Sequence, residues 1–258
     1  MLAKCQANWR NGSGAESVRA AITIYPIVIC LCCFDSLKFR VSYTHKAHSA
    51  LQLNIDSANA ELRNASPEAI VRWALAQGGR TIATTSMGRN AAVMLHLVSQ
   101  VDPSVPTIWV DTGYNLRDTY VVAERLIRDL KLNIHVYSPQ MTSERRNAIM
   151  GGIPTVDEEA RHAEFTRQVK LEPFDRALAD FQPDFWLTGI RREETEHRKT
   201  LDVVSHDARG IVKVAPIFYW SDAQVDAYMA QHGLPTCKHY FDPTKVMDGR
   251  ECGLHTAA

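Results

Sequence analysis

Residues 81–90 read TIATTSMGRN, and this stretch decides the fold of the chain. Its first five residues are β-branched or small, as a buried strand requires. A Ser-Met-Gly turn follows at 86–88, and apolar residues then recur at helical spacing over 91–98. A strand that enters a helix through a short Ser/Gly loop directs backbone N–H groups and the positive end of the helix dipole at one point. The stretch therefore favours phosphate binding, although a plain turn with glycine for tight geometry is the common alternative.

The same alternation of strand and helix continues along the chain. Apolar strand patterns recur over residues 106–110 (PTIWV), 133–137 (NIHVY) and 184–188 (DFWLT), and residues 116–130 form an amphipathic helical pattern between the first two. Strands and helices that alternate at this spacing predict an α/β fold with a doubly wound parallel sheet.

Shorter signals predict where individual elements begin and turn. Ser66-Pro67 and Ser221-Asp222 each have an N-cap residue before a helical pattern. Residues 201–214 predict a hairpin that turns at 207–210. Residues 170–173 (KLEP) are predicted to begin the last helix of a charged helical region.

Charge and cysteine content limit the class of protein. Lys+Arg and Asp+Glu balance at 29 each, so no overall field recruits nucleic acid or an anionic membrane. An anionic ligand must then be held by a local cluster of basic groups. The six cysteines leave a long stretch without any, which does not fit a disulfide-stapled secreted fold and indicates a reducing cytoplasm. They stand at positions 5, 30, 32, 33, 237 and 252.

The chain divides into three predicted parts. Residues 1–52 contain a short apolar run at 21–34 without a convincing cleavage site after it, and they are interpreted as a disordered extension or a non-native start. A membrane-targeting role is the alternative. Residues 53–234 form the predicted globular domain, and residues 235–258, with almost no apolar periodicity, form a tail that moves or docks as a flap.

Polar residues follow two of the predicted strands. Asp111-Thr112-Gly113-Tyr114 ends the strand at 106–110, and Arg191 and Arg192 follow the strand at 184–188. Open α/β sheets bind ligands at the carboxyl ends of their strands, so the two arginines are candidates for the local positive charge. Solvated loop arginines are the plain alternative.

The last chemically informative residue is Cys252, with Arg250 and His255 beside it. Cationic neighbours lower the pKa of a thiol and raise its thiolate fraction at neutral pH. Cys252 is therefore a candidate nucleophile, with an incidental terminal cysteine as the alternative.

Taken together, the motifs resemble those of the phosphoadenosine phosphosulfate (PAPS) reductase family of assimilatory sulfate reduction. The agreement covers roughly residues 56–234 and a final six-residue signature. The motifs are Thr85-Ser86-Met87-Gly88, Asp111-Thr112-Gly113-Tyr114, Lys170-x-Glu172-Pro173, Gly189-Ile190-Arg191-Arg192-Glu193, Lys213-Val214-x-Pro216-Ile217 and Arg250-Glu251-Cys252-Gly253-Leu254-His255.

The resemblance implies a Rossmann-like sheet of the adenine nucleotide alpha-hydrolase, or ATP-pyrophosphatase, type. It also implies a set of substrate-binding residues around a nucleophilic Cys252. Those that hold phosphates and sulfate would be Ser86, Gly88, Arg89, Lys170, Arg191, Arg192 and Arg198. The others would be Asp111, Thr112, Gly113, Gly189, Arg250 and His255.

The activity implied by the resemblance is a thioredoxin-dependent reduction of PAPS to sulfite and adenosine 3′,5′-bisphosphate. The Cys252 thiolate would attack sulfur and form a cysteine S-sulfonate, and thioredoxin or glutaredoxin would release sulfite from it. Because a polyanionic substrate repels a thiolate, clustered cations must offset that repulsion. The resemblance implies a cytoplasmic enzyme and a possible homodimer, with neither nucleic acid nor membrane as a partner.

Relatives that reduce adenosine phosphosulfate bind a [4Fe–4S] cluster through a Cys-Cys pair and a later Cys-x-x-Cys. Here Phe165 and Thr166 stand in place of the pair, and only Cys237 lies near the later motif. We therefore expect no iron–sulfur cluster and favour the 3′-phosphorylated substrate. The tail also lacks the Ser-x-Gly-Asp stretch that many relatives carry.

Several alternatives remain open from the sequence. One is an adenosine phosphosulfate reductase without a cluster, and another is an ATP pyrophosphatase or adenylyltransferase relative, whose loop would carry an Asp that residues 86–91 lack. A third is a tail stapled by zinc through Cys237, His239, Cys252 and His255. In a fourth, Cys237 forms an intramolecular disulfide with Cys252.

Overall fold

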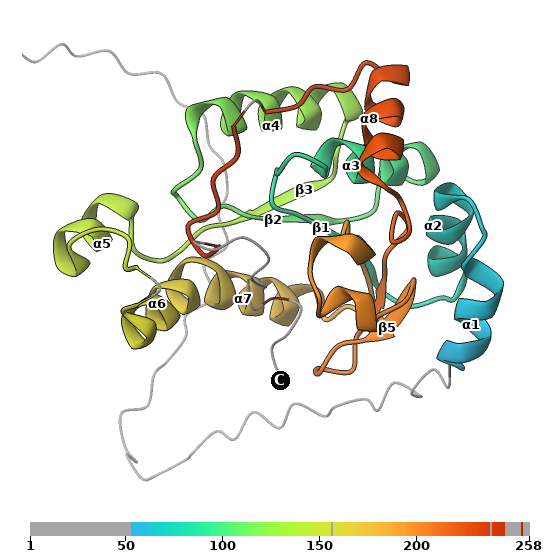
Figure 1. Cartoon of the computed structure of the whole chain (residues 1–258), viewed down its shortest axis with the longest axis horizontal. Coiled ribbons are helices and arrows are strands. Elements are labelled where there is room, and N and C mark those ends of the chain that lie inside the picture. Colours follow the sequence, from blue (N-terminus) through green and yellow to red (C-terminus); the bar gives the residue numbers. More distant parts are fainter. Residues whose placement is uncertain (1–52, 156, 238, 246–253, 255–258) are drawn as a thin grey trace, which may run out of the picture. The chain divides into compact units, whose positions relative to one another are not determined.

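The computed structural model describes residues 53–155, 157–237, 239–245 and 254 (Figure 1). The chain divides into two units at residue 50, and every described residue belongs to the second unit. The predicted extension at 1–52 lies outside the described residues. Among the described helices, none has the length and apolar character needed to span a membrane.

The described part of the chain contains a six-stranded sheet in the order β3-β2-β1-β4-β6-β5. All neighbouring strands are parallel except β5 and β6, which are antiparallel. The predicted doubly wound parallel sheet is therefore confirmed. The strands are β1 (Thr81–Thr85), β2 (Thr107–Val110), β3 (Ile134–Tyr137), β4 (Phe185–Leu187), β5 (Val204–His206) and β6 (Val212–Val214).

Helices cover both faces of the sheet (Figure 1), with α3, α4 and α8 on one side and α7 on the other. Eight α-helices are described: α1 (Ile55–Leu62), α2 (Pro67–Ala76), α3 (Ala91–Val101), α4 (Arg117–Leu130), α5 (Ser143–Met150), α6 (Glu159–Thr166), α7 (Glu172–Phe181) and α8 (Asp222–Gln231).

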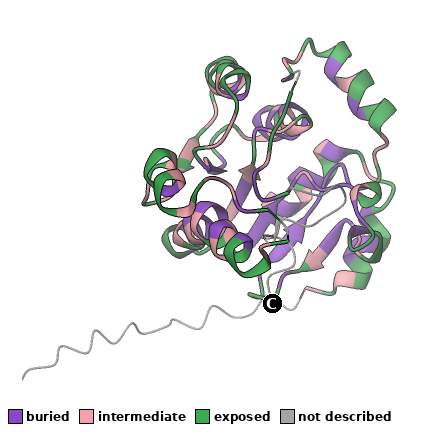
Figure 2. Cartoon of the chain, turned by 60° about the vertical axis from the view of Figure 1, so that its left-hand side comes forward, coloured by how far each residue is buried: buried purple, intermediate pink, exposed green. Residues whose placement is uncertain are grey.

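Successive side chains of a central strand point to opposite faces of the sheet, so an apolar cluster forms on each face. In β1, Ala83 faces the larger cluster, which includes residues of α2, α3, α4 and α8, whereas Ile82 faces the cluster built on Phe174 of α7. Trp109 and Ile108 of β2 divide in the same way. Figure 2 shows the buried residues concentrated in the strands and on the inward sides of the helices. Because both faces of the sheet are covered, neighbouring residues of a central strand, such as Ile82 and Ala83, are both buried rather than alternating between core and solvent.

Side-chain caps fix the helix starts that the sequence predicted. The Ser66 side chain accepts a hydrogen bond from Ala69 N, and the Ser221 side chain accepts one from Gln224 N. The predicted hairpin is also confirmed, with Asp207 accepting backbone hydrogen bonds from residues 209 and 211 in its turn.

The prediction that residues 170–173 begin the last helix of this region is confirmed, because α7 begins at Glu172 with Pro173 in its first turn. A π-helical turn, Arg167–Leu171, joins α6 directly to α7. Glu172 N donates to Arg167 O, five residues back. Pro173 has no N–H to donate to the carbonyl four residues before it, and a widened turn accommodates that missing bond. Lys170 thus lies inside a continuous helical path.

The side-chain amide of Asn59 in α1 forms two hydrogen bonds with the backbone of edge strand β5, as the backbone of a neighbouring strand would. Its Nδ2 donates to Val204 O (2.9 Å), and its Oδ1 accepts from Val204 N (2.8 Å). Asn59 is 7% exposed. Replacing Asn59 with Ala leaves two buried backbone groups of Val204 without partners, and we expect a loss of about 2–4 kcal/mol in the free energy of unfolding.

Urea unfolding measures this loss. The matched control is Asn133→Ala, which removes an exposed amide that donates to Ser104 O and should cost less than about 1 kcal/mol. Equal losses in the two variants would show that the Asn59 pair does not hold β5 in place.

Candidate active site

A cavity of about 300 Å³ opens at the carboxyl ends of β1 and β4. The chain adds β2 and β3 on one side of β1 and returns to place β4 on its other side. The helices flanking such a reversal leave the sheet on opposite faces, which opens a crevice between adjacent strand ends. Thr84 and Thr85 from β1 and Thr188 after β4 line this cavity, together with Ile108 and Val110 of β2.

The loop between β1 and α3 forms one part of the cavity wall, and Ser86 and Gly88 both line it. The loop is held in a tight shape, because Met87 has a left-handed backbone (φ 54°) and its N–H donates to Thr85 Oγ1 (3.0 Å). At the start of α3, the N-cap Asn90 makes no side-chain cap to the helix. Its amide donates instead to Glu194 (3.4 Å), and the uncapped helix start at the cavity suits an anion.

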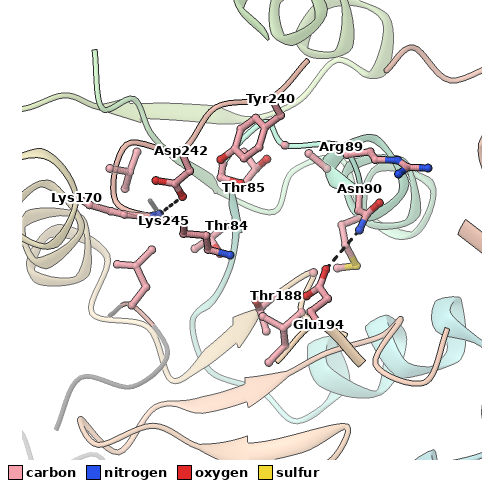
Figure 3. A pocket seen from close by; sticks show the side chains of 18 of the residues that line it. Thr84, Thr85, Arg89, Asn90, Lys170, Thr188, Glu194, Tyr240, Asp242 and Lys245 are labelled. Atoms are coloured by element: carbon pink, nitrogen blue, oxygen red, sulfur yellow. Dashed lines mark hydrogen bonds and ion pairs between the residues drawn. The ribbon is translucent and has the colours of Figure 1, made fainter. Parts of the chain in front are cut away.

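Lys170 extends from the π-helical turn to the cavity, where it forms a buried ion pair with Asp242 (Figure 3). Lys170 Nζ donates to Asp242 Oδ2 (2.6 Å) and to Thr244 Oγ1 (3.1 Å). The two charged side chains are only 5% and 7% exposed. Burial alone would raise the pKa of the Asp242 carboxyl, but the Lys170 ammonium and the donors of Thr244 outweigh it and hold that pKa below its usual range.

A second cation, Arg198, lines the cavity and pairs with Glu194. The Arg198 side chain is 5% exposed, and Glu194 is the carboxylate with which its guanidinium pairs in the described structure. Glu194 also accepts from the Arg191 N–H (3.1 Å) and from Asn90. Figure 3 shows Glu194 and Asn90 at one side of the cavity and the Lys170–Asp242 pair at the other. Glu194 thereby joins the segment after β4 to the start of α3.

The other predicted arginines lie differently. Arg89 lines the cavity but pairs on the surface with Asp226 (3.2 Å). Arg191 is buried and donates to the Trp220 carbonyl (3.2 Å) and to Asp222 (2.7 Å), which fixes the start of α8. Arg192 is exposed, with its guanidinium carbon 5.9 Å from the ring centre of Tyr219. Within the described residues, neither Arg191 nor Arg192 lines the cavity.

Asp111, Thr112 and Gly113 form a turn after β2 that, in the described structure, lies outside the cavity lining. Asp111 Oδ1 accepts from Gly113 N (3.0 Å) and from the Tyr120 hydroxyl (2.8 Å). Burial, followed by this bond to Asp111, raises the pKa of Tyr120 to about 12. The carboxylate of Asp111 thus orders the connection from β2 into α4.

The segment after α8 forms the remaining described wall, and we call residues 239–245 the wall segment. Its Tyr240 ring lies so close to the β1–α3 loop that a Cβ on Gly88 would be 3.3 Å from it. Just before the segment, the Cys237 thiol contacts Met87 O (3.6 Å). Burial raises the pKa of Cys237, which favours the protonated thiol at neutral pH.

Three predicted site residues, Arg250, Cys252 and His255, lie outside the described residues. Among the predicted residues that are described, the structure brings six to the cavity: Ser86, Gly88, Arg89, Lys170, Gly189 and Arg198.

Sequence reasoning missed the carboxylates of the cavity, Asp242 and Glu194, and the wall residues Tyr240 and Lys245. The only local signal for Asp242 is the pattern Asp-x-Thr, in which an Asp side chain accepts from the backbone two residues later. That pattern predicts a turn, but it does not indicate that the turn lies against Lys170.

The Lys170–Asp242 pair predicts a pH-dependent effect on stability. Because the pKa of Asp242 is lowered in the folded state, the pair stabilises the fold above the unfolded pKa of about 3.9 and loses this effect as the pH falls through the folded value. We expect Asp242→Asn to lose about 3 kcal/mol at pH 7 and less at pH 3.

Urea unfolding at both pH values measures the difference. The control Asp226→Asn breaks the Arg89 pair, in which both side chains are more than half exposed, and should cost at most about 1 kcal/mol. A loss in Asp242→Asn that does not change between pH 7 and pH 3 would contradict the ion pair as its source.

Comparisons with known proteins show the family of the chain. The family model described as the phosphoadenosine phosphosulfate reductase domain matches residues 80–243. A phosphoadenosine 5′-phosphosulfate reductase of Synechocystis sp. is 37% identical over 191 residues, which is 73% of this chain and 76% of the relative. The enzyme of the same name from Photobacterium profundum is 36% identical over 189 residues, with 71% and 72% covered.

Solved structures agree as well. The crystal structure of PAPS reductase from Candida auris, a phosphate complex, has a TM-score of 0.63 at 27% identity and covers 72% of this chain and 89% of its own. FMN adenylyltransferase of Candida glabrata, with a TM-score of 0.50 at 14% identity and 74% and 64% covered, shares the fold alone. These likenesses confirm the predicted Rossmann-like fold of the nucleotide alpha-hydrolase type. The chain belongs to the phosphoadenosine phosphosulfate reductase family.

Proposed function

We propose that this protein reduces PAPS to sulfite and adenosine 3′,5′-bisphosphate in sulfate assimilation, with thioredoxin or glutaredoxin as the reductant. The observation that carries the proposal is the cavity at the β1 and β4 ends, where the Ser86–Gly88 loop meets Lys170 and Arg198 in a member of this family. Because the positive and negative charges of the chain balance, no overall positive field attracts an anionic substrate. The local cations of the cavity must therefore bind it.

The cavity lining supports binding of a nucleotide that carries several negative groups. Cations approach it from separate elements, with Lys170 from the π-helical turn, Arg198 after β4 and Lys245 from the wall segment. The apolar side chains of Val110 and Leu254, which line the same cavity and are not fully buried, supply the kind of surface on which an adenine ring packs. Polar and apolar lining together fit an adenine nucleotide better than either does alone.

The proposed chemistry depends on Cys252, whose role is supported by the sequence signature of residues 250–255. Its thiolate attacks the sulfur of the sulfate group, an S–S bond forms, and the S–O bond to the 5′-phosphate breaks. The electron pair leaves with adenosine 3′,5′-bisphosphate. A thioredoxin thiolate then attacks Cys252 Sγ and releases sulfite, and the second thioredoxin thiol closes a disulfide and frees Cys252. The cations of the cavity stabilise charge that develops on the leaving group.

We propose that this reaction proceeds without an iron–sulfur cluster. Phe165 stands where cluster-binding relatives carry a cysteine, and its buried ring packs against Tyr114 at a ring-centre distance of 5.3 Å. An apolar side chain in that place supplies no thiolate ligand for iron. We also expect a cytoplasmic protein, where thioredoxin is kept reduced.

Sulfite release tests the function directly. With thioredoxin, its reductase and NADPH, we expect wild-type protein to release sulfite from PAPS and to do so faster than from adenosine 5′-phosphosulfate. Cys252→Ser should reduce the rate at least about a thousandfold, because a hydroxyl does not replace the thiolate. Faster turnover of the unphosphorylated substrate would favour the alternative substrate, and sulfite release by Cys252→Ser would refute the nucleophile.

Cys237→Ser separates an external reductant from an internal disulfide. Because Cys237 is buried and its thiol pKa is raised, we expect it to be a poor nucleophile and the variant to keep most of its thioredoxin-coupled turnover. The serine hydroxyl retains a donor for Met87 O. Loss of turnover in Cys237→Ser, with PAPS binding intact by calorimetry, would instead make Cys237 the resolving thiol.

A further inference from the structure

The wall segment holds the Asp242 carboxylate in one orientation before any ligand binds. Asp242 Oδ1 accepts from Thr244 N (3.0 Å) and from Thr244 Oγ1 (2.6 Å), and Lys245 N donates to Asp242 O (3.0 Å). Thr244 is 2% exposed, so this turn is buried. One carboxylate oxygen is thus engaged by its own turn, and the other receives the Lys170 ammonium.

Lys170 is placed where an ammonium is difficult to keep charged. Its side chain is 5% exposed, and burial favours the neutral amine of a lysine by up to several pKa units. Two other cations, Arg198 and Lys245, line the same cavity, and like charges act in the same direction. A carboxylate at 2.6 Å opposes both effects.

Other charged residues of the described structure near Lys170 pair with partners of their own. On its own helical path, Arg167 pairs with Glu164 and Glu172 pairs with Arg176. Across the cavity, Glu194 pairs with Arg198. Figure 3 shows Asp242 beside the Lys170 ammonium and Glu194 at the other side of the cavity. Among the described residues, Asp242 is the acidic residue that is hydrogen-bonded to the Lys170 ammonium.

We propose that Asp242 is a positioning residue for anion binding, whose carboxylate fixes the Lys170 ammonium at the cavity wall and keeps it protonated at working pH. The inference rests on the proposed function, because it assigns Lys170 to the anionic groups of the nucleotide. A neutral amine at this position would contribute a dipole where the substrate requires a full positive charge. The ion pair also connects the wall segment to the π-helical turn. The same contact therefore holds the wall segment against the cavity and orients the Lys170 ammonium.

A titration of the free protein tests this without any substrate. Lysine labelled with ¹³C at the ε-carbon reports each lysine pKa by NMR, and the signal absent from Lys170→Arg assigns Lys170. We expect a Lys170 pKa at or above the ordinary value of about 10.4 in wild-type protein. In Asp242→Asn it should fall by at least about one unit.

Thr244→Val is the control, because it removes a neutral partner of the same ammonium and the hydroxyl bond to Asp242, but it keeps the charge of the carboxylate and its backbone bond from Thr244 N. We expect the Lys170 pKa of this variant to stay within about half a unit of the wild-type value. A wild-type value well below 10.4, or equal shifts in the two variants, would overturn the proposal. The Lys170 pKa of wild-type protein tests the proposal even if Asp242→Asn does not fold.

Turnover provides a second readout. The ratio of kcat/KM between Asp242→Asn and wild-type protein should be lower at pH 9 than at pH 7 by the fraction of Lys170 that the NMR titration finds deprotonated in the variant, because only the variant loses the ammonium in this range. The ionisation of the Cys252 thiol also changes kcat/KM with pH, but an effect that is equal in both proteins cancels from the ratio. A ratio that does not change with pH, in a folded variant, contradicts the positioning role. Absence of turnover in wild-type protein would instead refute the proposed function and leave the NMR test to decide the role of Asp242.

Discussion

The parallel pairing of β1 with β2 on one side and with β4 on the other is the constraint on which the rest of the structure depends. It brings Thr85, at the end of β1, and Thr188, after β4, to the same edge of the sheet, although they are far apart in the sequence. The chain reverses its direction of winding there, and the cavity forms because the flanking helices diverge. Each functional element reaches the cavity by leaving one of these strands or by packing beside it.

A charge-balanced protein prepares a site for a polyanion by burying cations together with their own carboxylates. Lys170 is paired with Asp242 and Arg198 with Glu194, and these four side chains come from the helical turn, the segment after β4 and the wall segment. Uncompensated burial of either cation would cost several kcal/mol. Pairing stabilises the cations and fixes their directions, and it also makes their burial compatible with a stable fold.

The sequence predicts most of the fold because each element follows from local chemistry. The β-branched run at 81–85, the caps at Ser66 and Ser221, and the turn at Asp207 need no distant contact to be recognised. The helix start predicted at 170–173 matches the start of α7, but the π-helical turn that joins α7 to α6 was not predicted, because it depends on the helix before Pro173.

The candidate site is less accessible to such reasoning, since residues of one type in the same segment have different partners. Arg191 is directed to the start of α8 by Asp222, while Arg198 meets Glu194 in the cavity, and no local pattern separates them. The Lys170–Asp242 contact joins residues 72 positions apart, and its partners become visible only when the wall segment is in place. The site roles of the residues, including Cys252, therefore stay predictions that solution experiments decide.

The central claim is that this cavity presents the sulfur of PAPS to the Cys252 thiolate. Intact-protein and peptide mass spectrometry after a single turnover, with PAPS in slight excess and no thioredoxin, tests it most directly. The account predicts one SO₃ group added to the peptide that contains Cys252, and its removal when thioredoxin is supplied. Unmodified Cys252 alongside released adenosine 3′,5′-bisphosphate, or the SO₃ group on another residue, would contradict it.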